Sequence, residues 1–249
     1  MHRLQNKTSI VTGGAHGIGR AISELYAEEG SIVLIVDIDS AAGNEVANSI
    51  SKVGGRAEFC HADVASPKDT AQAVKSITDK HGRVDILCAN AAYLVPWHDV
   101  LSATEQEWER CLRVALKGTD NYTREVLPWM VKARRGSIII VASIQGLVAC
   151  PASTAYTFVK TGLIGYSRSV AYDYGEFNVR VNALCPGPIQ TRISPKPGEL
   201  GHDLGIKRTL LRRFGQPREV AQAAVFLGSE ESSYVTGSCL VVDGGWTAM

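Results

Sequence analysis

Residues 8–19 read Thr8-Ser9-Ile10-Val11-Thr12-Gly13-Gly14-Ala15-His16-Gly17-Ile18-Gly19. The apolar start predicts a strand, and the periodicity over 17–29 predicts an amphipathic helix, so the glycines occupy a strand-to-helix turn. Backbone N–H groups at such a helix start attract a pyrophosphate. Gly13, Gly17 and Gly19 are spaced G-x-x-x-G-x-G and not G-x-G-x-x-G, so the turn favours a dinucleotide site while a purely structural turn stays open.

An acidic residue ends the next apolar run. Asp37 follows the run 32–36 and lies roughly 20 residues beyond Gly19, the offset at which a carboxylate meets an adenosine ribose. A carboxylate there accepts hydrogen bonds from both ribose hydroxyls and repels a 2′-phosphate, and Ile38 adds no compensating charge. The sequence therefore predicts NAD rather than NADP, with a helix-capping aspartate as the alternative. His16 is a weaker phosphate contact or simply a turn residue.

Short, continuously apolar runs alternate with longer stretches of helical periodicity along the whole chain. Runs without period-2 alternation are typical of strands covered on both faces, and the stretches between them are long enough for crossover helices. We expect an α/β fold, a doubly wound parallel sheet of about seven strands with helices on both faces. The expected strands are 8–11, 32–36, 57–60, 84–88, 137–141, 179–184 and 239–242, and the expected helices are 17–29, 40–53, 67–81, 105–132, 153–174 and 217–228.

One region interrupts this pattern. Residues 186–216 contain several prolines and glycines, which is typical of a long functional loop. We expect a substrate loop there within a single domain spanning residues 1–249, because α/β domains commonly reach about 250 residues.

Composition excludes several function classes. The 249 residues are 45% hydrophobic and carry a formal net charge of +1, so they offer no large field for nucleic acid or a membrane surface. The six cysteines are far apart with no Cys-x-x-Cys pair, which predicts reduced thiols and no metal site. The first residues lack the apolar core of a signal peptide, and no stretch approaches a membrane span of about 18 apolar residues. We expect a cytoplasmic protein with a small-molecule substrate.

A tyrosine and a lysine share one face of the helix expected at 153–174. Tyr156 and Lys160 are four residues apart, so their side chains can meet. A nearby ammonium stabilises a phenolate and lowers the tyrosine pKa from about 10 toward neutrality, where the phenol becomes a useful general acid or base. Ser143 follows the apolar run 137–141 on a loop that can return to this helix. The pair alone is better explained by an exposed aromatic residue and a solvated lysine. With Ser143 nearby, the three residues predict a reacting centre in which Tyr156 is the general acid or base.

Taken together, these features resemble the short-chain dehydrogenase/reductase family over essentially the whole chain. The resemblance implies a Rossmann-type NAD-binding fold and, because the long helices at 105–132 and 153–174 match those that pair in family tetramers, a homotetramer or homodimer. The stretches that carry it are Thr12 to Gly19, Asp37, Asp63-Val64, Asn90-Ala91-Ala92, Ser143, Tyr156, Lys160, Pro186-Gly187 and Asp243-Gly244-Gly245.

The resemblance implies catalytic roles for Ser143, Tyr156 and Lys160. Tyr156 exchanges the proton with the substrate oxygen, and Ser143 hydrogen-bonds that oxygen as charge develops. Lys160 lowers the Tyr156 pKa and holds the nicotinamide ribose hydroxyls. The cofactor carries the hydride chemistry, and the protein orients its reactive carbon.

The resemblance also implies cofactor contacts at the ends of the strands. Asp63 and Val64 line the adenine, Asn90 approaches the adenosine-side ribose, and Thr191 contacts the nicotinamide carboxamide. The expected cofactor-binding residues are Gly13, His16, Gly17, Ile18, Gly19, Asp37, Ile38, Asp63, Val64, Asn90, Ala91, Tyr156, Lys160, Pro186, Gly187, Ile189 and Thr191.

Two positions depart from the family pattern. Ala115 stands where the family usually has an asparagine that shapes a helix irregularity and whose backbone carbonyl holds a water connecting Lys160 to solvent. Alanine keeps the carbonyl but loses the amide, so we expect slower or altered proton exchange and not inactivity. Ala92 replaces a usual glycine and adds one methyl group near the cofactor.

The expected walls of the substrate pocket come from the segment after the fourth strand, the surroundings of Ser143 and the start of the 186–216 loop. They are mainly apolar. Gln145 and His98 can hydrogen-bond a hydroxylated substrate or act as structural polar groups. The expected substrate residues are Tyr93, Trp97, Ile144, Gln145, Cys150 and Pro188.

These observations predict an NAD-dependent oxidoreductase that interconverts a secondary alcohol and its ketone. Three substrate classes stay open: a polyol or sugar, a cyclic alcohol or dihydrodiol, and a hydroxysteroid. An excess of basic residues over 192–213 suits a 3-oxoacyl-carrier-protein reductase, although Asp37 argues against one because reductive biosynthesis usually uses NADPH. The departure at Ala115 leaves a catalytically silent NAD-binding regulator as the remaining alternative.

Overall fold

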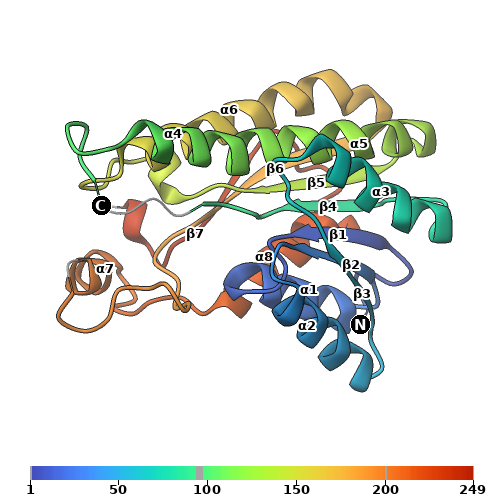
Figure 1. The fold of residues 1–249 in the computed structure, drawn as a ribbon, viewed down its shortest axis with the longest axis horizontal. Coiled ribbons are helices and arrows are strands. Elements are labelled where there is room, and N and C mark those ends of the chain that lie inside the picture. Colours follow the sequence, from blue (N-terminus) through green and yellow to red (C-terminus); the bar gives the residue numbers. More distant parts are fainter. Residues whose placement is uncertain (1, 94–97, 200, 249) are drawn as a thin grey trace.

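Seven parallel strands form one sheet in the part of the chain that this computed structural model describes, residues 2–93, 98–199 and 201–248 (Figure 1). Their order in the sheet is β3-β2-β1-β4-β5-β6-β7, which confirms the expected doubly wound arrangement. The strands are β1 (Thr8–Thr12), β2 (Ile32–Asp37), β3 (Arg56–His61), β4 (Ile86–Ala89), β5 (Gly136–Val141), β6 (Val179–Pro186) and β7 (Cys239–Val242).

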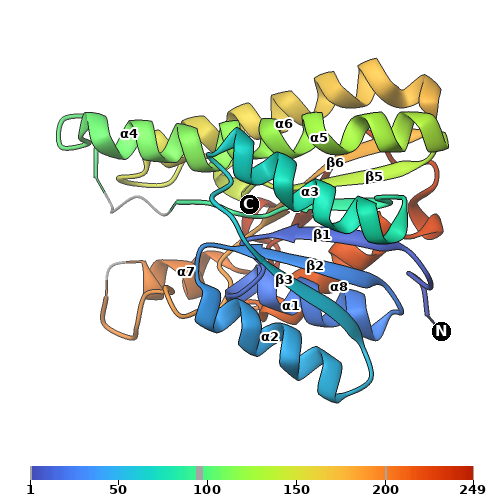
Figure 2. The ribbon, with the colours of Figure 1, turned by 45° about the vertical axis from the view of Figure 1, so that its right-hand side comes forward.

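A layer of helices covers each face of the sheet (Figures 1 and 2). The buried residues of α3, α5 and α6 join one apolar cluster, and those of α1, α2 and α8 join another. None of the helices in the described ranges is long and apolar enough to span a bilayer. Their bounds are α1 (Gly17–Glu28), α2 (Ser40–Lys52), α3 (Pro67–His81), α4 (Glu105–Cys111), α5 (Gly118–Ala133), α6 (Thr154–Tyr174), α7 (His202–Arg208) and α8 (Pro217–Gly228).

Burial on both faces explains the continuous apolar pattern of the inner strands. On β1, Ile10 packs into the cluster of α3, α5 and α6, while its neighbour Val11 packs into the other cluster. Both side chains are fully buried. β3 lies at the edge of the sheet, and its terminal residues Arg56 and His61 are exposed. An edge strand is partly exposed and carries polar residues, which explains why the apolar pattern of β3 in the sequence is weaker than that of the inner strands.

The expected helix over 105–132 is interrupted, so that prediction was wrong in its middle. α4 passes into a π-helical turn, Leu112–Lys117, before α5 begins at Gly118. Inside the turn the Thr119 hydroxyl donates to the Ala115 carbonyl at 2.7 Å. A π-helical turn accommodates one extra residue in the helix. It alters the helical pattern of apolar residues too little to be recognised in the sequence, and such turns often lie at functional sites.

The region 186–216 is irregular only in part, and α7 lies within it. The sequence prediction missed this helix because it has only about two turns of periodicity, with prolines and glycines on both sides. Thr209 ends the helix, where its hydroxyl donates to the Gly205 carbonyl at 2.7 Å.

The sheet reverses its strand order between β1 and β4, and Asn90 ties the two strand ends together there. The Asn90 side-chain amide donates to the carbonyls of Thr12 at 3.0 Å and Gly13 at 3.1 Å. The Thr12 hydroxyl in turn accepts from the backbone N–H groups of Asn90 and Ala91. Ligands of open α/β sheets bind at such a reversal, beyond the carboxyl ends of the strands. The fold therefore opens its crevice at the glycine-rich turn.

Asn182 on β6 anchors the segment that leads into β7. Its side chain is fully buried, its Nδ2 donates to the Val235 carbonyl at 2.8 Å, and its Oδ1 accepts from the Ser238 N–H at 3.1 Å. These two bonds position the start of β7 beside β6, where Ala183 pairs with Cys239.

Replacing Asn182 with leucine removes both bonds from a fully buried position. The Ser238 N–H then loses its side-chain acceptor, and the Val235 carbonyl keeps only the longer bond from Arg180 Nη1 at 3.4 Å. We expect Asn182→Leu to lower the free energy of unfolding in urea by about 2–4 kcal/mol. Asn44→Ala, at an exposed position of α2, is the control and should change it by less than about 0.5 kcal/mol. Equal stability of the two variants would contradict the anchoring role of Asn182.

Candidate active site

The glycine-rich turn is built for close approach of a ligand to the backbone. Gly13 and Gly17 have φ values of +62° and +50°, in the left-handed region that side chains disfavour. A Cβ added to Gly19 would lie 2.0 Å from the Gly13 carbonyl oxygen and 2.5 Å from Asn90 Nδ2. Only glycine fits at this position, and the residues present therefore fit a pyrophosphate laid along the turn.

A long cavity of about 620 Å³ runs from this turn along the carboxyl edge of the sheet. Every residue predicted to bind the cofactor lines it. The prediction missed further lining residues, among them Asp39, Ala62, Val114, Val141, Ala142, Arg192 and Ile193. Those that directly adjoin predicted residues, such as Asp39 and Arg192, could have been found from the strand ends, whereas Val114 is brought to the cavity only by the π-helical turn.

Two carboxylates stand in this cavity beside the glycine-rich turn, beyond the end of β2. Asp37 accepts hydrogen bonds from the backbone N–H groups of Ala15 and Asp39, both at 3.1 Å. Asp39 caps α2 by accepting from the Ala42 N–H at 3.1 Å, and its second oxygen lies 2.9 Å from His16 Nε2. These bonds hold Asp37 rigidly and pair the imidazole with Asp39.

Ser143, Tyr156 and Lys160 come together where β5 ends and α6 begins. Ser143 Oγ accepts from the Gln145 N–H at 3.1 Å, which leaves its own proton free for another acceptor. Lys160 Nζ donates to the Val141 carbonyl at 2.8 Å and lies 5.5 Å from the centre of the Tyr156 ring. The helical spacing of four residues thus brings the lysine and the tyrosine to the same place, as the sequence predicted.

The pKa of Tyr156 differs from the sequence prediction. Burial raises the pKa of this phenol to about 12, and the Ser143 hydroxyl beside it only partly opposes the shift. Burial likewise lowers the pKa of Lys160 to about 8. The expected depression of the tyrosine pKa was wrong for the protein alone, because loss of hydration outweighs the attraction of an ammonium that is bound to Val141.

The helix irregularity expected from the family is present although its usual asparagine is absent. Ala115 lies inside the π-helical turn, and its side chain is 1% exposed. Its carbonyl oxygen accepts from Thr119 at 2.7 Å and keeps a second lone pair for another donor. The asparagine side chain is therefore unnecessary for the shape of the backbone here.

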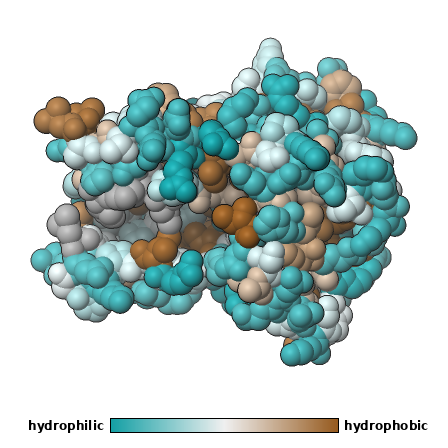
Figure 3. Space-filling view, in the orientation of Figure 1, coloured by the Kyte–Doolittle hydropathy of each residue, from teal (hydrophilic) through white to brown (hydrophobic). Residues whose placement is uncertain are grey.

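A second cavity, of about 240 Å³, adjoins Ser143 and Tyr156 on the side of α7. Figure 3 shows the surface hollowed on this side of the molecule, with apolar residues inside the hollow. Ile144, Gln145, Cys150 and Pro188 line the cavity as predicted. The lining also includes Ile193, Phe214, Leu204 of α7, Trp246 and His98.

The structure does not place the other two predicted substrate residues, Tyr93 and Trp97, on the wall of this cavity. Tyr93 is not among the described residues that line this cavity; its ring instead lies under the Arg110 guanidinium, 4.7 Å from the ring centre. Trp97 lies outside the described residues. Trp246 was missed by the sequence prediction. The only signal for it is that β7 ends at the same sheet edge as β6, where Asp243 accepts from the N–H groups of Gly245 and Thr247, both at 2.8 Å.

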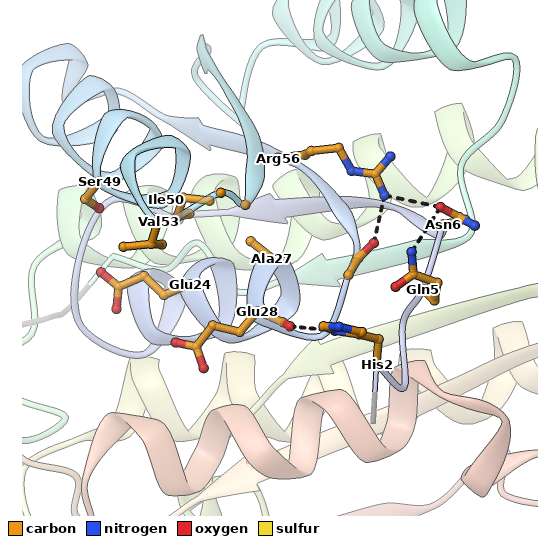
Figure 4. Close-up of a pocket in the computed structure, with 13 residues that line it drawn as sticks. His2, Gln5, Asn6, Glu24, Ala27, Glu28, Ser49, Ile50, Val53 and Arg56 are labelled. Atoms are coloured by element: carbon orange, nitrogen blue, oxygen red, sulfur yellow. Dashed lines mark hydrogen bonds between the residues drawn. The ribbon is translucent and has the colours of Figure 1, made fainter.

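A third hollow, of about 580 Å³, lies at the amino edge of the sheet near His2 and Arg56 (Figure 4). Its polar groups bind one another. His2 Nδ1 lies 3.1 Å from the Glu28 carbonyl oxygen, and Arg56 donates to the Gly30 carbonyl at 3.0 Å. We assign no chemistry to this hollow.

Burial of Lys160 makes a testable difference to stability. Between the folded pKa of about 8 and the ordinary value of 10.5, the unfolded chain binds a proton that the folded chain has released. The stability of the wild type relative to Lys160→Met should therefore rise with pH, by about 2 kcal/mol between pH 7.5 and 10. Urea unfolding of the cofactor-free proteins measures this difference.

Lys75→Met supplies the control, because Lys75 is 72% exposed on α3 and keeps its hydration on folding. Its stability difference from the wild type should not change over the same pH range. A Lys160→Met difference that is equally flat would contradict the role given to burial.

Comparison with known proteins identifies the family. A family model described as "Enoyl-(Acyl carrier protein) reductase" matches residues 13–247. The chain is 37% identical over 245 residues to the 3-oxoacyl-[acyl-carrier-protein] reductase FabG of Thermotoga maritima, covering 98% of each. It is 38% identical over 252 residues to the cyclopentanol dehydrogenase of Comamonas testosteroni, covering 100% of each.

A solved structure supports the same assignment. The chain matches a 7α-hydroxysteroid dehydrogenase complexed with NADH and 7-oxo glycochenodeoxycholic acid with a TM-score of 0.91 and 32% identity, covering 98% of this chain and 95% of that one. Together with the glycine-rich turn and the cavity behind it, these full-length matches show that the chain belongs to the short-chain dehydrogenase/reductase family, as a nucleotide-binding oxidoreductase that acts on CH–OH groups.

Proposed function

We propose that this enzyme uses NAD to interconvert a small secondary alcohol and its ketone at Ser143, Tyr156 and Lys160. The observation that carries the proposal is the junction of two cavities. Ser143 and Tyr156 line both of them, and Lys160 lines the long one. A substrate oxygen in the smaller cavity and a nicotinamide ring in the longer one would therefore meet at the tyrosine.

Each of the three side chains has a separate task. Tyr156 donates its proton to the ketone oxygen, or takes it from the alcohol in the reverse direction. Ser143, whose Oγ already accepts from the backbone, donates to the same oxygen as negative charge develops. Lys160 holds the ribose hydroxyls and stabilises the phenolate that the proton leaves behind. When bound, the nicotinamide ring supplies or accepts the hydride.

The acidic end of the long cavity supports NAD over NADP. Asp37 and Asp39 both line it, and the imidazole of His16, which also lines it, is bound to Asp39. No ion pair joins Asp37 to a cation within the described ranges. A 2′-phosphate would thus meet like charge, whereas ribose hydroxyls would find an acceptor. The NADH in the related 7α-hydroxysteroid dehydrogenase supports the same cofactor.

The size of the smaller cavity supports a small alcohol. Its volume of about 240 Å³ lies below the roughly 300–1,000 Å³ typical of pockets for drug-sized ligands, which argues against a four-ring steroid. The likeness to a cyclopentanol dehydrogenase favours a cyclic alcohol. Polar groups on the wall also suit a polyol or a dihydrodiol.

A 3-oxoacyl-carrier-protein reductase is the second candidate. The likeness to the Thermotoga maritima reductase favours it, as do the basic residues Arg192, Lys196 and Lys207 near the loop. Asp37 opposes it, because such a reductase usually draws on NADPH. A silent NAD-binding regulator would require that the three residues at the junction do no chemistry, and a turnover assay decides that point.

We also propose a homotetramer or homodimer located in the cytoplasm. Phe158 and Tyr172 on α6 are 57% and 90% exposed. Large apolar side chains gathered on one helix surface are typical of subunit contacts.

A panel of cyclic secondary alcohols, polyols and dihydrodiols tests the proposed reaction. We expect NAD reduction with at least one of them, followed by the absorbance of the reduced cofactor. Tyr156→Phe should lower kcat by roughly 100-fold or more, because it removes the proton donor. Tyr234→Phe, at a fully exposed position, is the control. Unreduced NAD with every alcohol would overturn the proposal and favour the silent regulator.

Cofactor preference is tested at the end of β2. Replacing Asp37 with serine and Ile38 with arginine removes a repelling carboxylate and adds a phosphate-binding cation. We expect the ratio of kcat/KM for NADP to that for NAD to rise by roughly 100-fold. Asp173→Ser, at an exposed position of α6, is the matched control. A wild type that already prefers NADPH would contradict the proposal and favour the carrier-protein reductase.

A further inference from the structure

The side chain of Gln145 has a buried oxygen without a partner. Gln145 Oε1 is shielded from solvent, and no described residue donates a hydrogen bond to it. The residue is fixed beside the reacting centre, since its N–H donates to Ser143 Oγ at 3.1 Å and its side chain lines the smaller cavity. A buried acceptor left without a donor is costly, so a ligand that supplies the donor gains binding free energy.

His98 presents a second polar group on the wall of the same cavity. The two carboxylate oxygens of Glu107 lie 3.0 and 3.1 Å from His98 Nδ1, and the Thr104 N–H holds that carboxylate at 2.8 Å. The imidazole is thus oriented through Nδ1, and within the described ranges no protein group hydrogen-bonds Nε2. Its outer nitrogen is available to a ligand.

Most of the remaining wall is apolar or already hydrogen-bonded, and Thr154, whose hydroxyl has no bond within the described residues, is exposed. Ser153 and Ser194 also line the cavity, but their hydroxyls donate to the carbonyls of Cys150 at 3.0 Å and Ile189 at 2.7 Å. Phe214 and Trp246 add aromatic surface. Apart from the reacting pair, the unused hydrogen-bonding capacity of this wall therefore includes Gln145 and His98.

We infer that Gln145 and His98 form a subsite for a second hydroxyl group of the substrate, which makes the substrate class a small diol or hydroxyketone. A hydroxyl suits both groups because it donates and accepts, and it fits either orientation of the glutamine amide. One substrate oxygen reacts at Tyr156 while another is held by the amide and the imidazole. This inference rests on the proposed alcohol dehydrogenase activity and narrows its substrate.

Paired substrates test the subsite. The probes are cyclopentanol and cyclohexanol, each compared with its cis and trans 1,2-diols and 1,3-diols, with NAD as acceptor. We expect the wild type to favour at least one diol over its parent alcohol in kcat/KM by roughly 10-fold. In Gln145→Met, which keeps the length of the side chain, the ratio of diol to alcohol should fall by roughly 5- to 10-fold.

Gln72→Met, at an exposed position of α3, is the matched control and should leave the ratio unchanged. Because the readout is a ratio within one protein, a general loss of folded enzyme does not move it. A wild type that favours the parent alcohols, or a Gln145→Met ratio equal to that of the wild type, would overturn the subsite and leave the proposed function standing. Failure of every alcohol and diol to reduce NAD would overturn both together.

Discussion

The inner strands of this protein are covered on both faces, and that constraint determines where chemistry can occur. Ile10, Val11 and Ile139 are fully buried, so a polar side chain midway along an inner strand loses its hydration unless, like Asn182 on β6, it finds partners there. The polar groups that must stay available to a ligand therefore lie at the strand ends. Because all strands are parallel, their carboxyl ends lie at one edge, and the functional side chains gather there from distant parts of the sequence.

Order at that edge depends on a few buried hydrogen bonds. Asn90 joins the ends of β1 and β4 through Thr12 and Gly13, so the glycine-rich turn has a fixed distance from the next strand. Lys160 donates to the last carbonyl of β5 and so links α6 to the sheet at the same edge. Away from that edge, Asn182 ties β6 to the segment that precedes β7. All three side chains bond to backbone groups, which the sheet and its connections hold in place.

Features that follow local periodicity were predictable from the sequence, and those set by packing were not. The helical spacing of Tyr156 and Lys160 and the place of Asp37 after an apolar run were enough to bring these residues to the right edge. The π-helical turn at Ala115 and the approach of Trp246 to the substrate cavity depend on contacts between distant segments. The Tyr156 pKa was predicted in the wrong direction, because the sequence shows a lysine nearby but not the loss of water around both groups.

The pKa values of Tyr156 and Lys160 determine which protonation state of the pair is present before the reaction. With values of about 12 for Tyr156 and about 8 for Lys160, the pair at neutral pH is a neutral phenol beside an ammonium. This is the protonation state that reduction of a ketone consumes, because the phenol is the proton donor. Oxidation of an alcohol must instead begin from the phenolate, which burial disfavours and the ammonium favours. Burial therefore favours the neutral phenol that ketone reduction needs, whereas the Lys160 ammonium favours the phenolate that alcohol oxidation needs. The charge on Lys160 thus decides how readily the phenolate forms.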